Sequence, residues 1–125
     1  EFEIEGVTEL PQVEIIYGHV NDNGALAYAA AKAGAKGLVY AGLGNGNMSE
    51  HMKKVLSEIQ RQGVVVVRST RVGNGVVTRN GAINDDRYDF VVADTLNPQK
   101  AQILLMLALL ETNKPAEIQR IFWMY

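Results

Sequence analysis

A glycine-rich segment at 42–47, with the sequence GLGNGN, has the composition of a turn that contacts a ligand. Its three glycines let the backbone approach a bound molecule closely, and the free N–H groups of a helix that follows such a turn attract polar groups. The side chain of Asn45 or of Asn47 would add an amide contact. A second interpretation is that Asn47 simply caps the following helix. On the residues alone the capping role is favoured, because asparagine is among the best N-caps.

A dinucleotide-binding fingerprint is excluded at this segment. The third glycine of the G-x-G-x-x-G pattern would fall on Asn47, and Arg68 stands at the end of the next strand, where that motif requires an acidic residue. The sequence RSTR at 68–71 brings two arginines that could hold an anion or pair with carboxylates across an interface. A structural or subunit-interface role is favoured for them, since interfaces are rich in arginine.

The residues alone give no evidence of a catalytic or metal-binding centre. His19 and His51 have no partners at metal-ligand spacing, so neither a metal site nor a cofactor is predicted. Ser69, His19 and Asp94 can be assembled on paper into a hydrolytic triad, but no nucleophile-elbow pattern supports it. Asp94-Thr95 is interpreted as turn and cap chemistry.

Strands and helices alternate along the chain, and this alternation must position the candidate residues. Short β-branched runs predict strands at 13–17, 37–41, 64–67 and 90–93. Apolar periodicity and capping residues predict helices at 25–33, 48–62 and 98–111, and a short terminal helix from 115. Strands joined by helical crossovers pair in parallel and carry helices on both faces. We therefore predict a three-layer α/β/α fold with a four-stranded parallel sheet, whose carboxyl edge carries the candidate loops.

The composition is that of one globular domain. The chain has 125 residues, of which 47% are hydrophobic, and a net charge of −2 with its basic residues scattered, which argues against nucleic-acid or membrane partners. It contains no cysteine, which excludes disulfides and cysteine zinc sites. Residues 1–10 are mixed, begin without methionine and end before Pro11, and we expect them to be a connector arriving from elsewhere in a longer protein.

Five collinear segments carry a resemblance to a known family. They are LPQVEIIY at 10–17, AGLGNGN at 41–47, VVRSTR at 66–71, LNPQKA at 96–101 and IQRIFWMY at 118–125. Together they closely resemble the C-terminal domain of bacterial type II L-asparaginases and glutaminase-asparaginases. Because the segments occur in the family's order and spacing over nearly the whole chain, the resemblance is specific.

The resemblance implies a reaction whose catalytic half lies outside this chain. Such enzymes hydrolyse L-asparagine, and often L-glutamine, through a threonine nucleophile and an acyl-enzyme, without metal or cofactor. The nucleophile and its Thr-Lys-Asp activating group belong to an N-terminal domain, and neither of that domain's threonine motifs occurs here. Residues 11–125 would then be the C-terminal domain and 1–10 the connector from the missing catalytic domain. The isolated chain is expected to be inactive.

The resemblance also implies an assembly and a substrate contact. Family active sites form between the N-terminal domain of one subunit and the C-terminal domain of a neighbour, in homodimers and homotetramers that are commonly periplasmic. The C-terminal domain lends a side chain to the α-amino end of the substrate, and that position falls on Asn47. A family glutamate falls on Ala82 by ungapped alignment, so selectivity is relaxed, Asp85 or Asp86 replaces the glutamate, or this loop aligns with the family at a different offset.

Two other functions fit the same residues. The first is a free-standing module that binds a small ligand or a partner at the sheet rim. The second is the asparaginase-like subunit of an archaeal-type tRNA amidotransferase. The sequence pI of about 5.7 counts against the second, since an RNA partner favours a basic surface.

Overall fold

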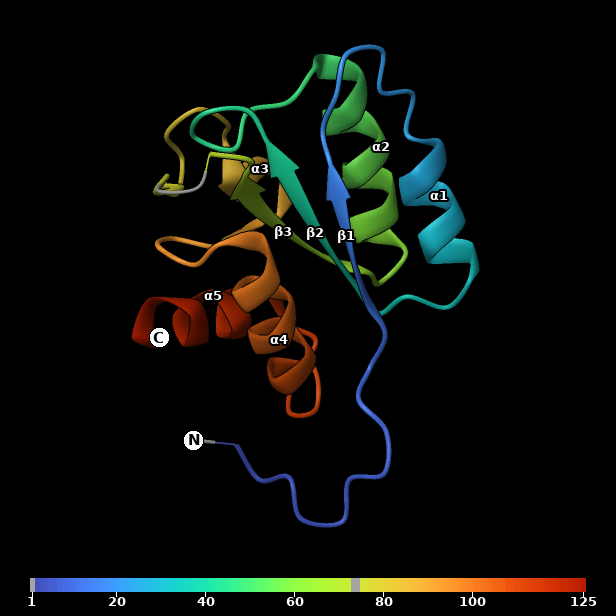
Figure 1. Ribbon diagram of the computed structural model, residues 1–125, viewed down its shortest axis with the longest axis vertical. Helices are drawn as coiled ribbons and strands as arrows, with labels where there is room; N and C mark the ends of the chain where they lie inside the picture. The colour runs from blue at the N-terminus through green and yellow to red at the C-terminus, as the bar shows by residue number, and fades with distance from the viewer. Residues whose placement is uncertain (1, 73–74) are drawn as a thin grey trace.

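The parallel sheet predicted from the sequence is present. The computed structural model describes residues 2–72 and 75–125, so Glu1 of the predicted connector and positions 73–74 lie outside the described residues. The strands are β1 (Val13–Tyr17), β2 (Gly37–Gly42), β3 (Val65–Thr70) and β4 (Val91–Val92). They are all parallel and follow the chain order β1-β2-β3-β4 (Figure 1).

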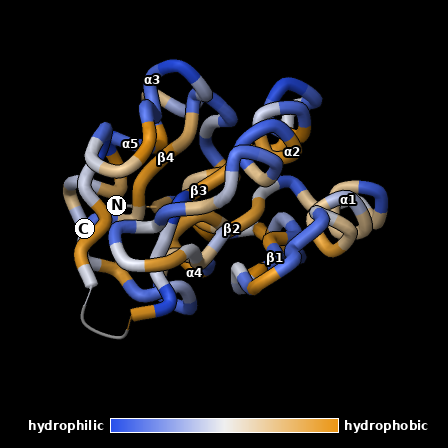
Figure 2. The backbone as a smooth tube through the Cα atoms, turned by 90° about the horizontal axis from the view of Figure 1, so that it is seen from above, coloured by the Kyte–Doolittle hydropathy of each residue, from blue (hydrophilic) through white to orange (hydrophobic). Residues whose placement is uncertain are grey.

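Helices cover both faces of the sheet, which confirms the three-layer α/β/α fold (Figure 1). The helices are α1 (Ala25–Lys32), α2 (Glu50–Arg61), α3 (Asp85–Tyr88), α4 (Pro98–Ala108) and α5 (Pro115–Met124). One core cluster joins the sheet to α1 and α2, and a second joins it to α4 and α5. Strand residues alternate between the clusters, so Leu38 and Val66 face α2 while Val39 and Val67 face α4. Figure 2 shows the strands in hydrophobic colours between the two helical layers.

The predicted boundaries differ from the observed ones mainly at the ends of elements. The third strand is longer than predicted and includes Arg68-Ser69-Thr70, whereas the fourth is only two residues long. The cap predicted for α4 is confirmed, because the Asn97 side chain accepts a hydrogen bond from Lys100 N at 2.8 Å and Pro98 occupies the first turn. No helix in residues 2–72 and 75–125 is long and apolar enough to cross a membrane.

The outer edge of β4 is closed by a side chain of α5. Gln119 is buried, and its Oε1 accepts a hydrogen bond from Val92 N at 2.8 Å. Its Nε2 donates to Val92 O at 3.2 Å. The amide thus takes the place of a neighbouring strand at a short edge, which would otherwise leave buried backbone groups unpaired.

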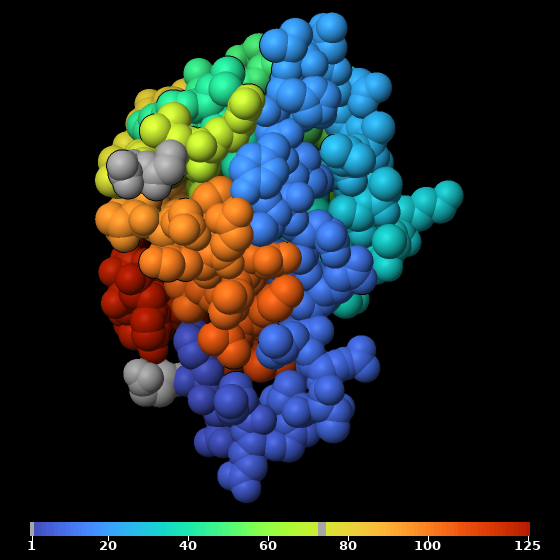
Figure 3. Space-filling view, in the orientation of Figure 1, coloured from blue at the N-terminus to red at the C-terminus, as the bar shows by residue number. Residues whose placement is uncertain are grey.

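The sheet register gathers the loops that carry the candidate residues. Tyr17 pairs with Ala41, and Gly42 pairs with Thr70, so β1, β2 and β3 end at nearly the same level. The loops that follow them therefore meet at the carboxyl edge, at the top of Figure 1. Figure 3 shows these loops on the surface, while the N-terminal arm extends from the opposite end of the molecule.

Candidate functional site

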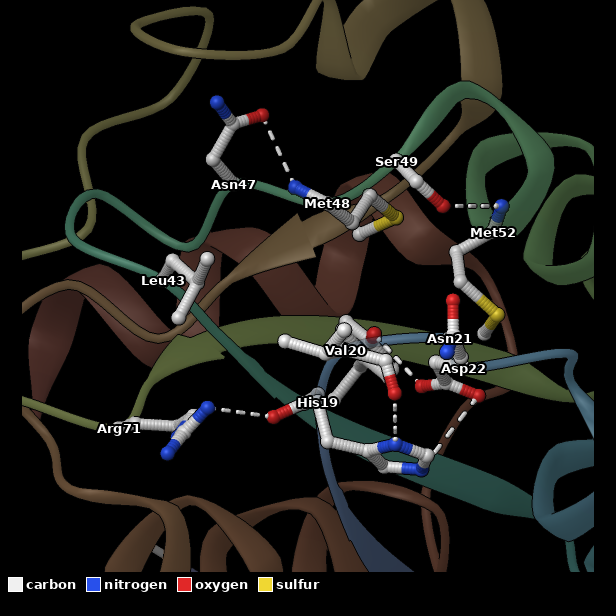
Figure 4. A pocket seen from close by; sticks show the side chains of 12 residues that line it. His19, Val20, Asn21, Asp22, Leu43, Asn47, Met48, Ser49, Met52 and Arg71 are labelled. Atoms are coloured by element: carbon white, nitrogen blue, oxygen red, sulfur yellow. Dashed lines mark hydrogen bonds and ion pairs between the residues drawn. The ribbon is translucent and has the colours of Figure 1, made fainter.

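A cleft of about 520 Å³ opens at the carboxyl ends of the strands. Its walls are the segment 18–22 after β1, the segment 43–52 from the glycine loop into α2, and Arg71 after β3 (Figure 4). Parallel sheets bind ligands at this edge, so the cleft lies where the topology predicts a site. Within it the glycine loop at 42–47 is the part that the sequence singled out.

The glycine loop is a tight turn held by its own backbone. Leu43 N donates to Asn47 O at 3.0 Å, and Asn47 N donates to Leu43 O at 2.7 Å. A Cβ atom on Gly42 would lie 2.3 Å from Asn47 O, a distance at which the turn could not close. Gly46 has φ of 71°, in the left-handed region that side chains disfavour. The glycines are therefore required by the conformation of the turn.

Asn47 lies on the open side of this turn, and the capping role favoured from the residues alone is wrong. Ser49 is the N-cap of α2, because its Oγ accepts a hydrogen bond from Met52 N at 3.1 Å. Asn47 precedes the cap by two residues, since the turn closes before the helix begins, and its Oδ1 accepts from Met48 N at 2.9 Å (Figure 4). Within the part of the chain that the structure describes, Asn47 Nδ2 has no hydrogen-bond partner. Leu43 beside it is 61% exposed, so the loop presents an open face.

Arg68 has a structural role behind the glycine loop. Its side chain is fully buried and makes a two-pronged ion pair with Asp85, at 2.6 Å from Nε to Oδ1 and 2.8 Å from Nη2 to Oδ2. The Nη1 group donates to the carbonyls of Asn45 at 2.7 Å and Gly46 at 3.0 Å. The Nη2 group donates to Thr78 O at 3.3 Å. The structural role predicted for this arginine is confirmed, whereas a role at an open anion site is excluded by its burial.

The carboxylates suggested as replacements at Ala82 are committed to other partners. Asp85 is fully buried against Arg68 and also accepts from Asn80 N at 2.8 Å, so its proposed role as a substrate contact is wrong. Asp86 is exposed, and hydrogen bonds from the side chains of Asn80 and Arg79 hold its pKa below the usual value. Ala82 itself is exposed.

The triad that could be written on paper is not assembled. Ser69 is fully buried, and its Oγ has no hydrogen-bond partner in the described chain. The ring of His19 contacts Val20 O at 2.9 Å and approaches Asp22 at 4.0 Å, and no hydrogen bond joins it to Ser69. Asp94 has φ of 59° and lies in a turn closed by the hydrogen bond from Leu96 N to Ala93 O at 3.2 Å, which agrees with the turn interpretation. Residues 2–72 and 75–125 contain no group of three or more potential metal ligands.

The wall of the cleft contains a polar pair that sequence reasoning missed. The hydroxyl of Tyr40 on β2 donates to Asp22 Oδ2 at 2.9 Å, and Arg71 Nη1 donates to Gly18 O at 2.7 Å. Burial, and then the hydrogen bond to the Asp22 carboxylate, raise the pKa of Tyr40. Eighteen residues separate Tyr40 from Asp22, so no local sequence pattern could have predicted the hydrogen bond between them.

This pair gives a pH-dependent prediction. The folded state holds the Tyr40 proton to a higher pH than the unfolded chain, whose value is the ordinary 10, so stability present below pH 10 is lost as the pH rises further. We expect Tyr40→Phe to be less stable by about 1 kcal/mol at pH 7, and the difference from the wild type to narrow above pH 10. Urea unfolding of both proteins from pH 7 to 11 measures this. A constant difference across that range would contradict it.

Comparison with known proteins gives one consistent result. Residues 12–122 match a family described as the Glutaminase/Asparaginase C-terminal domain. The chain is 52% identical over 122 residues to L-asparaginase 2 of Bacillus subtilis, covering 98% of the chain and 32% of that protein. It is 48% identical to glutaminase-asparaginase of Pseudomonas fluorescens biotype A, covering 100% of the chain and 35% of that protein. It is 44% identical to a probable periplasmic L-asparaginase of Haemophilus influenzae, covering 97% of the chain and 35% of that protein. The chain thus spans about a third of the length of these relatives.

Proposed function

The chain belongs to the glutaminase/asparaginase C-terminal domain family, and from that premise we propose that it is the supporting half of an amidohydrolase that releases ammonia from L-asparagine or L-glutamine. The reactive threonine would belong to an N-terminal domain preceding residues 11–125, with residues 1–10 as the connector. The named activities of the relatives, L-asparaginase and glutaminase-asparaginase, support this substrate class.

The observation that carries the proposal is the open face of Asn47. The residue stands on a rigid turn, is not used as a helix cap, and keeps Nδ2 unengaged within the described residues. One Oδ1 lone pair remains beside the bond from Met48 N, so the side chain can accept from an ammonium group and donate to a carboxylate. Both groups occur at the α-end of a free amino acid. A rigid amide suits their recognition, because little conformational entropy is lost on binding.

We propose further that the carboxyl edge meets the catalytic domain of a neighbouring subunit in a homodimer or homotetramer. The exposed Leu43 beside Asn47 would lie in that interface. A periplasmic location is proposed on the name of the Haemophilus relative. The isolated domain would release no ammonia from asparagine, and measurable turnover by it would overturn this assignment.

Replacing Asn47 with alanine in the full-length enzyme should lower kcat/KM for asparagine about tenfold. A hydrogen bond to a charged group contributes about 1.5 kcal/mol, and 1.4 kcal/mol corresponds to a factor of ten. Ammonia release at varied substrate concentration measures the change. The matched control is Asn113→Ala, because Asn113 is an exposed asparagine beside the opposite end of the sheet, near Gly63 and Pro115. Unchanged kinetics in Asn47→Ala would remove this residue from the site.

A further inference from the structure

A second asparagine of the glycine loop joins it to a distant segment of the chain. Asn45 Oδ1 accepts a hydrogen bond from Thr78 N at 2.8 Å, and Asn45 Nδ2 donates to Thr78 Oγ1 at 3.0 Å. A single amide therefore holds both the backbone and the side chain of a residue 33 positions away. We call this pair of hydrogen bonds the Asn45–Thr78 clamp.

The clamp rests on the buried guanidinium of Arg68. That group donates to the carbonyls of Asn45 and Gly46 on one side and to Thr78 O on the other. The two segments are therefore held by side-chain bonds at the surface and by a shared cation below. The arrangement is close-fitting, since a Cβ atom on Gly81 would lie 2.5 Å from Asn45 Nδ2.

The two segments joined by the clamp carry the two positions that the family resemblance assigns to substrate binding, Asn47 and Ala82. Asn47 lies two residues beyond Asn45 in the loop, and Ala82 lies four residues beyond Thr78. Between Thr78 and Ala82, Asn80 N is bound to the Asp85 carboxylate that also pairs with Arg68. Loss of the clamp would thus alter the position of Asn47 relative to the segment from Thr78 to Ala82.

We propose that Asn45 is a positioning residue, which orients Asn47 for the substrate by clamping the glycine loop to Thr78. This inference rests on the proposed function and adds a residue with no substrate contact of its own. Because the clamp acts on the substrate's α-end, far from the amide that reacts, its loss removes binding that is equal in the ground and transition states. Such a loss raises KM and leaves kcat unchanged.

The test uses the full-length enzyme with asparagine as substrate. Asn45→Ala should raise KM about five- to tenfold, the size of effect expected for one misplaced hydrogen bond to a charged group, with kcat within about twofold. Thr78→Val, which removes only Oγ1 and keeps the N–H, should give a smaller rise. Thr78→Ser restores the hydroxyl and should have the wild-type KM. Thermal unfolding of each variant accompanies the kinetics, so that Thr78→Val and Thr78→Ser decide the matter if Asn45→Ala folds poorly.

A double-mutant cycle separates positioning from a general loss of structure. If Asn45 acts through Asn47, then Asn45→Ala should have less than a twofold effect in the Asn47→Ala background. Fully additive effects, or an unchanged KM in Asn45→Ala and Thr78→Val, would overturn the inference while leaving a role for Asn47 intact. An Asn47→Ala variant with normal kinetics would instead remove Asn47 from the substrate site, whereas a full-length protein that releases no ammonia from asparagine or glutamine would refute the proposed function.

Discussion

Replacing Arg68 with methionine is expected to lower the free energy of unfolding by about 3–5 kcal/mol. The side chain is fully buried, and the substitution would leave the Asp85 carboxylate inside the protein without its partner. The carbonyls of Asn45, Gly46 and Thr78 would also lose a donor. Since whole domains are stable by only about 5–15 kcal/mol, this one change removes a large fraction of the total.

Urea unfolding of the wild type and of Arg68→Met measures the effect. The double variant Arg68→Met/Asp85→Leu should recover part of the loss, because the unpaired charge is then gone as well. The matched control is Lys53→Met, which breaks the surface ion pair of Lys53 and Glu50 and should change stability by less than about 1 kcal/mol. A loss of under 1 kcal/mol in Arg68→Met would show that the buried pair contributes little to stability.

Replacing Gln119 with leucine is expected to cost about 2–4 kcal/mol, the second-largest effect that the structure predicts. The substitution keeps an apolar body of similar size but leaves Val92 N and Val92 O without partners in the interior. Each unsatisfied buried group costs about 1–3 kcal/mol. The Gln119 Oε1 atom also accepts a hydrogen bond from Arg79 Nη1 at 2.9 Å, so the substitution removes a contact to the residue that follows Thr78 as well.

Chemical denaturation and amide hydrogen exchange together test this prediction. Gln119→Leu should lower the unfolding free energy and speed exchange at Val92, because the edge of β4 is then open. Gln99→Leu is the control, since Gln99 is an exposed glutamine of α4 that donates to Tyr17 Oη at 3.0 Å and should matter by less than about 0.5 kcal/mol. Equal effects of the two substitutions on the free energy of unfolding would show that the hydrogen bonds of Gln119 to Val92 contribute no more to stability than an exposed contact.

The errors of the sequence analysis have a common cause. Asparagine at position 47 and serine at position 49 are both good N-caps, and propensity alone favoured the first. The choice was made by the backbone bonds between Leu43 and Asn47, which close the turn and delay the helix. Asp85 was a reasonable candidate to replace the glutamate missing at Ala82, because nothing in the local sequence pairs it with Arg68, 17 residues earlier.

The sequence by itself determined the elements and their order, except for the four-residue helix α3, which was not predicted. Apolar periodicity, β-branched runs and the Asn97-Pro98 cap are local signals, and each was realised within a few residues. Strands joined by helices must pair in parallel, so the three-layer fold and the position of the loops at one sheet edge followed as well. The family resemblance also needed only the order and spacing of short segments, and the match over residues 12–122 agrees with it.

Only the tertiary structure decided which side chains are committed inside the protein and which stay free. The pairs Arg68–Asp85, Asn45–Thr78, Tyr40–Asp22 and Gln119–Val92 join residues 17 to 33 positions apart. Such contacts depend on how the layers stack, and a one-dimensional pattern carries no information on which polar groups will meet after burial. In the glycine loop, the Asn45 amide is bound to Thr78 and Ser49 caps α2. Asn47 is therefore left as the exposed amide of the loop.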